Sequence, residues 1–502
     1  MAVQDSQDRF VRFASAPASP AAQDFHQAFE SLVISRSGGV LIVGWVDDST
    51  APLEAITVIG NGWSLRFDAN VLARVRRADV EKALGKHTIH RFGYFGFIAT
   101  GEKLATDGEF RIEIALAGDW RIPLAGTAKI IGDEELLNVA LSYLADSRHF
   151  EDPELGAVAA IDGGVANEIV VFRQHIAGRA GNPYVKRFAS GGSRHKGSVI
   201  VSLHGAVEAF SIQNALFATG PAATDYEFIY LCDDPALAET LLAQARLAAK
   251  LYGTDQTIAI LPSKTTFGAA SNAGAAIAQS DRLLLVDPGL FPRDRDWAEK
   301  HGAILDSRPS GETKLFGAPL FYENGAFCHA GLYYDLRSGP YLLDGEIVRF
   351  QLADLKSLAG GPPQDTARTM EARPVPGIGG AFMSFQRNWF ETLGGFSESY
   401  LHGDFQDADI CLKSIAAGVP PWLHDLHFWH LDWKRDIDPA AYKGGSIVNR
   451  WLFSASWGDR IAENLSGRMP AHPAFRKPAL AEADIAAPSK HNGMQKPRRS
   501  AA

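Results

Sequence analysis

The sequence has few cysteines and no long apolar run. Its three cysteines are spaced in a way that fits neither a zinc site nor a disulfide framework, so we expect free thiols in a reducing compartment. The first residues lack the basic-then-apolar pattern of a signal peptide. No stretch approaches the roughly 18 consecutive apolar residues that suggest a membrane-spanning helix. We therefore expect a protein that acts in the cytoplasm, without a transmembrane segment.

Several common ligand-binding motifs are also absent. No GxGxxG follows a predicted strand, no GxxxxGK[ST] occurs and HExxH is missing, which argues against a dinucleotide enzyme or a P-loop NTPase. The net charge of −9 is spread along the chain, whereas a nucleic-acid partner requires a basic face. The C-terminal tail alone is basic, and we expect it to be disordered, with a weak contact to anionic lipid as the alternative. Its cations are Lys490, Lys496, Arg498 and Arg499.

What is present is the composition of a globular protein with more than one domain. The chain has 502 residues, of which 46% are apolar and 21% are charged, and this length predicts two or three domains. Changes of pattern along the chain predict the boundaries. We expect a flexible N-terminus (1–25), an all-β sandwich accessory domain (26–132), a helical connector (133–196), an α/β domain (197–436), a C-terminal helical extension (437–480) and a disordered tail (481–502).

The β-sandwich prediction depends on alternating apolar residues. In FRIEIAL, Phe110, Ile112 and Ile114 alternate with Arg111 and Glu113, which places the apolar side chains on one face of a strand. The segments GVLIVGWV and AITVIG predict further strands, separated by turn residues. The period then changes, because EELLNVALSYLAD and VANEIVVFRQHIAG have helical spacing.

From residue 198 onward, strand and helix patterns alternate. The short apolar segments SVIVSL, YEFIYLC, TIAIL and RLLLVD are separated by helical segments, which is typical of a largely parallel sheet covered on both faces. Ligands of such sheets bind outside the carboxyl ends of the strands. At these places the sequence has Asp233 and Asp234 after one strand and Asp287 after another.

A third acidic group lies in GDFQDADICLK, which contains Asp404, Asp407 and Asp409. A single aspartate after a strand is most often a turn or helix-capping residue. Three acidic groups within one α/β unit instead favour a site for binding or for acid–base chemistry.

The α/β half resembles the GT-A fold (nucleotide-diphospho-sugar transferase-like) of family 2 glycosyltransferases. The resemblance runs from residue 198 to 433, and its most specific part is GGFSESYLHGDFQDADICLK. It implies a mixed, mainly parallel sheet and a nucleotide-sugar donor. The residues that would bind the donor nucleotide are Asp233, Asp234, Gly268, Asn272 and Asp287.

The same resemblance implies an acceptor site and a catalytic base. Asp407 matches the family's base, which an inverting transfer needs because the acceptor hydroxyl loses a proton as it attacks. Considered alone, Asp407 is an exposed carboxylate at a helix start, where the helix dipole favours it. The residues that would bind the acceptor are Gly379, Gly380, Gly395, Phe396 and Asp404.

The family commonly has a histidine after the base that contacts a metal ion or the diphosphate, and His430 in HDLHFWHLDW matches it. Histidine suits either role because its charge changes near neutral pH. His424 and His427 are competing candidates, and a histidine packed among aromatic side chains is the alternative. Nearby aromatic residues could stack on sugar faces or belong to the core: Trp422, Trp429 and Trp433.

The resemblance also implies a divalent cation, Mn²⁺ or Mg²⁺, with Asp287 and His430 as its ligands. Gly289, however, stands where the family's Asp-x-Asp element has its main metal-binding carboxylate. Such cations usually bind through one or two carboxylates plus phosphates, so this loss should weaken metal binding unless another residue compensates. The residues that could compensate are Asp294, His430, Lys434 and Arg435.

Two further positions depart from the family pattern. Gln406 replaces the glutamate that precedes the base, which keeps the size and hydrogen bonding of the side chain but removes its charge. His204 and Gly205 stand where the family has Pro-x-Tyr-Asn after the first strand.

We expect an inverting glycosyltransferase that moves a sugar from a nucleotide-sugar to a glycan or lipid-linked acceptor, in assembly of a bacterial surface polysaccharide. It would act in the cytoplasm or at the inner face of the membrane. The alternative is a catalytically degenerate GT-A protein that binds a nucleotide, a glycan or a partner enzyme, with the β-sandwich as its working part. A methyltransferase is disfavoured because the first turn is not rich in glycine. Convergence of Asp233, Asp287, Asp407 and His430 on one cleft would favour the enzyme.

Overall fold

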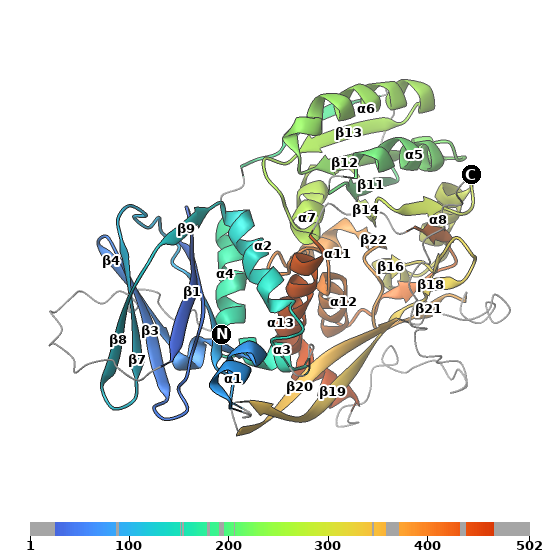
Figure 1. Cartoon of the computed structure of the whole chain (residues 1–502). Coiled ribbons are helices and arrows are strands. Elements are labelled where there is room, and N and C mark those ends of the chain that lie inside the picture. The colour runs from blue at the N-terminus through green and yellow to red at the C-terminus, as the bar shows by residue number, and fades with distance from the viewer. Residues whose placement is uncertain are drawn as a thin grey trace, which may run out of the picture.

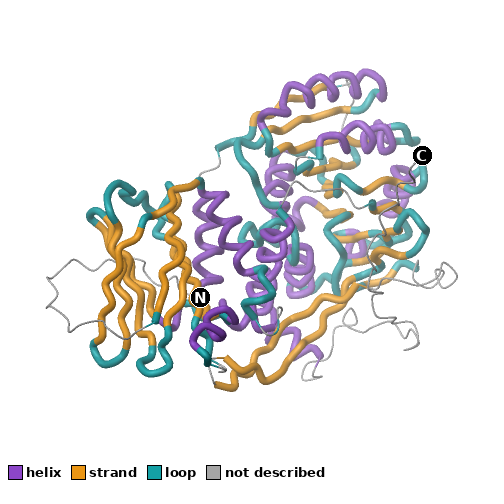
Figure 2. Tube along the Cα trace, viewed as in Figure 1, coloured by secondary structure: helices purple, strands orange, loops and turns teal. Residues whose placement is uncertain are grey.

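The computed structural model describes residues 26–86, 90–150, 152, 155–177, 181–189, 195–204, 206–343, 346–357, 371–431 and 438–465. The predicted flexible N-terminus and the basic tail lie outside the described residues, as do Gly205, Trp433, Lys434 and Arg435. Figure 1 and Figure 2 show a β-rich unit, a layer of helices and an α/β unit arranged side by side.

The N-terminal unit consists of two sheets packed face to face. Their orders are β5-β6-β2-β1-β9 and β4-β3-β7-β8. Buried side chains from both sheets, including Ile42, Val58 and Ile114, form one core, so the predicted all-β sandwich is confirmed. The strands are β1 (Gln27–Ser35), β2 (Gly39–Val46), β3 (Leu53–Gly60), β4 (Trp63–Asp68), β5 (Ala73–Val75), β6 (Gly93–Ala99), β7 (Phe110–Leu116), β8 (Trp120–Gly126) and β9 (Ala128–Ile131).

Helices cover the outer face of the five-stranded sheet. Leu136 and Phe172 share a core with Val33, Leu41 and Phe97 of that sheet. No single helix in the described part of the chain is long and apolar enough to cross a membrane, and only the pair α3–α4, bent by 75°, passes that test jointly by length and composition. The helices of this part are α1 (Ala78–Leu84), α2 (Asp133–Leu144), α3 (Leu155–Ile161) and α4 (Val165–Ala177).

The second half forms a nine-stranded sheet of order β10-β13-β12-β11-β14-β22-β16-β23-β21. Its central strands β13, β12, β11 and β14 are parallel, and antiparallel pairs flank them, which confirms the predicted mixed sheet. The edge strand β10 comes from the segment 133–196. The strands are β10 (Tyr184–Phe188), β11 (Gly197–Ser202), β12 (Tyr226–Cys232), β13 (Asp255–Ile260), β14 (Arg282–Val286), β16 (Leu315–Gly317), β21 (Arg373–Pro374), β22 (Phe382–Gln386) and β23 (Trp422–Leu423).

The central strands are apolar on both faces because helices cover both. In β11, Val199 and Val201 belong to the core shared with α5, α6 and α8, whereas Ile200 belongs to the core shared with α7, α11 and α12. The helices of this half, together with the short α9 (Ser310–Thr313), are α5 (Val207–Ala218), α6 (Ala238–Tyr252), α7 (Phe267–Ile277), α8 (Trp297–Ser307), α11 (Arg387–Thr392) and α12 (Gln406–Ala416).

A small sheet, a long hairpin and a long helix complete the fold. The small sheet has the order β15-β24-β17-β18, and β19 pairs with β20 in the hairpin. Helix α13 packs against α2 and α3 on one side and against the hairpin on the other (Figure 1). These elements are β15 (Leu290–Pro292), β17 (Leu320–Phe321), β18 (Phe327–His329), β19 (Leu332–Leu343), β20 (Glu346–Ser357), β24 (Phe428–His430) and α13 (Pro439–Leu465).

Candidate active site

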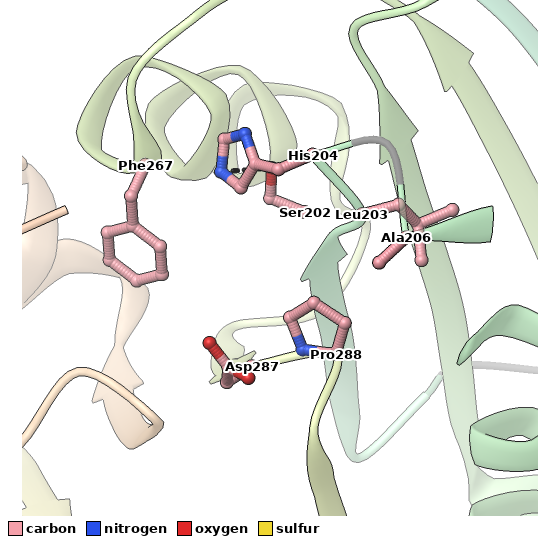
Figure 3. Close-up of a pocket in the computed structure, with 7 residues that line it drawn as sticks. All are labelled: Ser202, Leu203, His204, Ala206, Phe267, Asp287 and Pro288. Atoms are coloured by element: carbon pink, nitrogen blue, oxygen red, sulfur yellow. Dashed lines mark hydrogen bonds between the residues drawn. The ribbon is translucent and has the colours of Figure 1, made fainter. Parts of the chain in front are cut away.

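A pocket opens at the carboxyl ends of β11 and β14, beside the start of α7. Open parallel sheets bind their ligands at this edge. In Figure 3, Phe267 and His204 face Asp287 and Pro288 across the opening. The space measures about 320 Å³ when its open mouth is included. Its lining consists of Ser202, Leu203, His204, Ala206, Phe267, Asp287 and Pro288.

His204 links the ends of two neighbouring strands. Its Nε2 lies 2.9 Å from Oγ of Ser202, and its Nδ1 lies 3.4 Å from Oδ2 of Asp233. The φ angle of His204 is 41°, in the left-handed region that residues with a Cβ rarely adopt and that the surrounding structure must hold. These contacts fix the imidazole in the pocket wall and join Asp233 to the pocket.

Asp233, the residue predicted to contact the nucleobase, is buried at the end of β12. Burial alone would raise its pKa, but the hydrogen bond with His204 and the charges of His204 and Lys264 outweigh it and lower the pKa. The Oδ2 atom also accepts the N–H of Thr265 at 3.3 Å. Among the described residues, Oδ1 has no hydrogen-bond partner and lies 3.8 Å from Nζ of Lys264. This oxygen is enclosed by the protein, and the ammonium group of Lys264 is its charged neighbour.

Asp287 stands directly after β14 and contacts His430 of β24. The Oδ1 atom of Asp287 accepts the backbone N–H of Gly289 at 2.8 Å and lies 3.7 Å from Nε2 of His430. The other ring nitrogen of His430 lies 3.6 Å from Sγ of Cys328. Burial lowers the pKa of His430, but Asp287 and Cys328 favour the protonated ring more strongly and raise the pKa to about 9. His430 is therefore a cation at neutral pH.

Asp407, the predicted base, is half-buried near the start of α12. Its two carboxylate oxygens accept the N–H groups of Gly380 and Ala408, both at 2.8 Å. Burial has the largest influence and raises the pKa of Asp407 to about 6; the two N–H groups oppose the rise and the charge of Asp404 adds to it. A carboxyl group with this pKa is ionised at neutral pH and accepts a proton more readily than an ordinary aspartate.

The predicted base lies beside the predicted donor residues. The carbonyl oxygen of Ala381 accepts the N–H of Asp287 at 2.9 Å, and the preceding residue, Gly380, binds Asp407. A Cβ atom on Gly380 would lie 3.5 Å from the Cβ of Asp407 and 3.7 Å from the ring of Phe267. Asp407 is thus adjacent to the part of the pocket that Asp287 and Phe267 line.

Asn272, predicted to bind the donor, holds the loop that contains Phe396. Its Oδ1 accepts the N–H of Phe396 at 3.0 Å, and its Nδ2 donates to the carbonyl of Phe396 and to Glu398. Gly395 has a φ of 68°, and a Cβ there would lie 2.7 Å from Oδ1 of Asn272, which explains the glycine. A Cβ on Gly268 would lie 3.2 Å from Phe396. Ligand contacts by these residues stay predictions.

Asp234 and Asp404 bind protein groups away from the pocket lining. Oδ1 of Asp234 accepts the N–H of Ala236 at 3.0 Å and caps the short 3-10 helix Pro235–Leu237. Oδ1 of Asp404 accepts the hydroxyl of Tyr442 in α13 at 2.5 Å. Both carboxylates therefore shape their own segments, and their predicted ligand contacts are not tested by this geometry.

The competing histidines have partners elsewhere. His424 is buried, and its Nε2 lies 3.1 Å from the carbonyl oxygen of Glu312. His427 lies 2.7 Å from Asp425 and 3.6 Å from Asp294, so Asp294 is not directed to Asp287 as a compensating ligand. Of the three candidates, His430 is the one that pairs with Asp287. The neighbouring ring contacts are Trp422 with His424 and Trp429 with Arg293.

Sequence reasoning did not identify four residues that shape the site: Ser202, Phe267, Cys328 and His329. Ser202 and Phe267 could have been found from their positions, since they end β11 and begin α7. Nothing in the local pattern marks Cys328 or His329. Nε2 of His329 accepts the N–H of Gly379 at 2.9 Å. Burial, with nearby positive charges, lowers the pKa of His329 to about 4, which keeps this ring neutral.

The described residues do not provide a complete metal site. Asp287 and His430 lie next to one another, yet no group of three or more His, Cys, Asp or Glu side chains within the described ranges could hold a metal ion. At the position of the expected second carboxylate, Gly289 offers only an N–H group, which binds Asp287. Among the described residues the protein ligands at this place are thus one carboxylate and one imidazole, and Mn²⁺ or Mg²⁺ bound there would need donor phosphates and water to complete its coordination.

No family model matches the sequence. Over 213 residues the chain is 26% identical to the "Uncharacterized protein y4gI" of Sinorhizobium fredii (strain NBRC 101917 / NGR234), and this match covers 40% of the chain and 21% of that protein. The chain thus corresponds to about a fifth of the length of this relative.

Several solved structures have a similar arrangement at low sequence identity. Mannosyltransferase PcManGT from Pyrobaculum calidifontis, in complex with GDP-Man and Mn2+, is 13% identical, with 66% of this chain and 89% of that chain covered and a TM-score of 0.33. GalNAc-T7 with UDP, GalNAc and Mn2+ is 13% identical, with 56% and 52% covered and a TM-score of 0.37. S. aureus TarS 1-349 is 12% identical, with 56% and 77% covered and a TM-score of 0.32. All three sequence identities are below 25%, and all three TM-scores are below 0.5.

Proposed function

We propose that the protein is a glycosyltransferase that moves a sugar from a nucleotide-sugar to an acceptor hydroxyl, with inversion at the anomeric carbon. The observation that carries the proposal is the carboxylate of Asp407, whose pKa is raised to about 6 and which lies beside the pocket lined by Asp287 and Phe267. A carboxylate in this state can take a proton from an acceptor at neutral pH.

In the proposed reaction the acceptor oxygen forms a bond to the anomeric carbon while the bond from that carbon to the diphosphate oxygen breaks. The acceptor proton passes to Asp407, and the nucleoside diphosphate leaves with the bonding electron pair. Negative charge develops on the leaving diphosphate and requires a positive partner. His430, with its pKa raised to about 9 by Asp287 and Cys328 against the effect of burial, supplies such a charge.

The donor nucleotide has a candidate partner in Asp233. Its buried Oδ1 has no hydrogen-bond partner among the described residues, and an unsatisfied buried acceptor is costly unless a ligand supplies a donor. An N–H group on a nucleobase such as uracil or guanine would satisfy it. Lys264, 3.8 Å away, adds a positive charge near the nucleotide. These features support a nucleotide-sugar rather than an uncharged sugar donor.

The acceptor that we propose is a glycan or a lipid-linked sugar in assembly of a bacterial surface polysaccharide, at the inner face of the membrane. This part of the proposal comes from the family resemblance of the segment around Gly379, Gly380, Gly395 and Phe396. Fold-level similarity alone does not determine a substrate.

The direct test is a thermal-shift screen of UDP-, GDP- and dTDP-sugars, with and without Mn²⁺, followed by measurement of nucleoside diphosphate release. A ligand that binds the folded state raises Tm. We expect one nucleotide class to raise the Tm of the wild type and of Asp407→Asn equally, and only the wild type to release diphosphate. If every donor leaves Tm unchanged, the proposal fails.

A second candidate is a degenerate protein that binds the nucleotide without turnover. The observation in its favour is that Oδ1 of Asp287 already accepts the N–H of Gly289, at the position where the family binds its metal. This candidate predicts the same Tm increase but no diphosphate release from the wild type with any acceptor. The two measurements therefore separate the two candidates.

A further inference from the structure

Helix α13 binds the segment that precedes the proposed base. The amide of Asn449, which is 1% exposed, accepts the N–H of Leu401 at 2.7 Å and donates to the carbonyl oxygens of Leu401 at 2.7 Å and of Asp404 at 3.2 Å. Tyr442 donates its hydroxyl to the side chain of Asp404 at 2.5 Å. The oxygen and the N–H groups of the Asn449 amide, and the hydroxyl of Tyr442, are thus all bound to residues 401–404.

The same helix also binds α12 beyond the base. Nε1 of Trp457 donates to Oδ1 of Asp409 at 2.8 Å, and Asp409 is 4% exposed. Asp409 lies two positions after Asp407, within the first turn of α12. Contacts from α13 therefore lie on both sides of Asp407 in the sequence.

The segment between these contacts needs support. His402 and Phe405 have φ angles of 56° and 69°, in the left-handed region that residues with a Cβ rarely adopt. Such conformations persist where the surrounding structure holds them. Asn449 binds the backbone on either side of His402, at Leu401 and Asp404.

On its opposite side α13 is attached to the helices that cover the β-sandwich. Ala441 and Val448 share a core with Leu141 of α2. Leu401, directly before His402, belongs to that same core. Nε1 of Trp451 donates to Asp162 at 2.6 Å. The support of the base segment thus extends through α13 to the helices that cover the β-sandwich.

We propose that α13 positions the base, with Asn449 as the central positioning residue, and that the N-terminal unit serves to hold α13 in place. The inference rests on the proposed role of Asp407. In this proposal the N-terminal unit contributes to the reaction by supporting α13, and it does so without binding a ligand itself.

The proposal separates turnover from donor binding. The pocket lining comes from β11, β14 and α7, and α13 contributes none of it. The N–H of Phe267 donates to the carbonyl oxygen of His402 at 3.1 Å, so the segment also contacts one edge of the pocket. Loss of the Asn449 amide should therefore displace Asp407 and leave the Asp287 side of the pocket, which rests on β14 and Ala381, in place. A displacement of about 1 Å in a reacting group lowers the rate by up to ~100-fold.

The test compares Asn449→Ala with Asn464→Ala in the full-length protein. Asn464 lies on the same helix but is half-buried, and among the described residues its side chain donates to the carbonyl of Arg460 in its own helix. We expect Asn449→Ala to lower kcat by ~10- to 100-fold with the donor KM within about threefold of wild type, and Asn464→Ala to change neither. Water that enters the loosened segment should also move the acid limb of the kcat profile to lower pH, because burial is what raises the pKa of Asp407.

Tyr442→Phe serves as a milder variant if Asn449→Ala does not fold, as judged by circular dichroism. It keeps the ring and removes the hydroxyl that donates to Asp404, and we expect the same changes on a smaller scale. The pKa of Asp407 is also measured by NMR titration of labelled aspartate carboxyls, with Asp407→Asn to assign the signal. This readout requires no turnover, so it tests the positioning role even if the proposed function fails. Folded variants with wild-type kcat and an unchanged Asp407 pKa would overturn the inference.

Discussion

Oδ1 of Asp287 lies 3.7 Å from Nε2 of His430 and accepts the N–H of Gly289 at 2.8 Å. A single carboxylate oxygen thus faces a cationic ring and a backbone donor at the position that the family resemblance assigns to a metal-binding element. In the proposed reaction, the positive partner of the leaving diphosphate is the side chain of His430.

Replacement of His430 by alanine should lower kcat by about 100-fold, since one preorganised positive partner of the leaving group is lost. His427→Ala is the matched control, because His427 pairs with Asp425 and Asp294 instead. Treatment with EDTA should leave wild-type turnover largely intact. Loss of activity in EDTA together with a silent His430→Ala variant would contradict this assignment.

The alkaline side of the pH profile follows from the same residue. The folded-state pKa of His430, raised to about 9, exceeds its ordinary value of 6.5. The ion pair with Asp287 is therefore fully present below pH 6.5, and its contribution to stability is lost as the pH rises to about 9. We expect kcat to fall above about pH 9 in the wild type, and this limb should be absent from the residual activity of His430→Ala.

Asp407→Asn should lower kcat by ~100- to 10,000-fold, because the acceptor proton loses its base. In the wild type kcat should rise with pH through about 6 as Asp407 ionises. The same raised pKa predicts that the stability of the folded protein falls over the pH range in which kcat rises. Between pH 3.8 and about 6 the folded state retains a proton that the unfolded state has lost, so the stability of the wild type falls as the pH rises.

The asparagine variant carries no such charge, and its Tm should exceed that of the wild type at pH 7. The difference should vanish below about pH 4, where the wild-type carboxyl is protonated in both states. Scanning calorimetry at the two pH values measures this effect. A variant that is inactive and also less stable at pH 7 would indicate general disruption rather than loss of a base.

The side chain of Gln406, directly before Asp407, is a buried amide whose role can be tested by substitution. It is 1% exposed, and both amide atoms lack a hydrogen-bond partner among the described residues. Replacement by methionine removes this unsatisfied amide and should raise Tm; if a substrate hydroxyl uses the amide, kcat/KM falls by up to about tenfold. Gln406→Glu places a like charge beside Asp407 and should move the acid limb above pH 6. Unchanged Tm in the methionine variant would show that the amide is satisfied in solution.

Two glycines of α13 form a matched pair for the contact between this helix and α2. A Cβ on Gly444 would lie 1.9 Å from the carbonyl oxygen of Leu141, whereas a Cβ on Gly458 would meet no atom within 4 Å. Gly444→Ala should lower the free energy of unfolding by about 1–3 kcal/mol through overpacking. Gly458→Ala should raise it by ~0.5–1 kcal/mol through helix propensity. Urea unfolding measures both, and equal effects would contradict the close packing of α13 on α2.

The parts of the fold that sequence reasoning could predict are those with local patterns. The alternation in FRIEIAL predicted β7, in which Phe110, Ile112 and Ile114 are buried and Arg111 is exposed. The alternation of short apolar segments with segments of helical spacing likewise predicted the central sheet, because each segment indicates one strand or one helix by itself. The edge strand β10 was not predicted, because five residues of mixed polarity carry no strong period and pair with β13 from a distance.

In the candidate site, too, residues within a local motif could be predicted, whereas contacts between distant parts of the chain could not. Asp407 could be identified from its neighbours in the chain, because the base stands in a contiguous motif. The bonds of Asn272 to Phe396 join residues 124 positions apart, and those of Asp404 to Tyr442 join residues 38 positions apart. No local sequence pattern predicts partners this far away in the chain. The sequence therefore marks these polar residues as candidate site residues, but it does not predict the segments to which they are bound.

The contact between α13 and α2 has a consequence for biosynthesis. Lys443 binds the carbonyl of Ala145 across 298 positions of the chain. At a translation rate of 5–20 residues per second, this separation corresponds to roughly 15 to 60 s between the appearance of the two partners on the ribosome. During that interval the apolar side of α2 has no α13 to pack against. Residues 401–404, which precede Asp407, become supported only when α13 has been made. If the proposed roles of the pocket and of Asp407 hold, a nascent or truncated chain would form its donor pocket before it could catalyse transfer, because the support of residues 401–404 depends on α13.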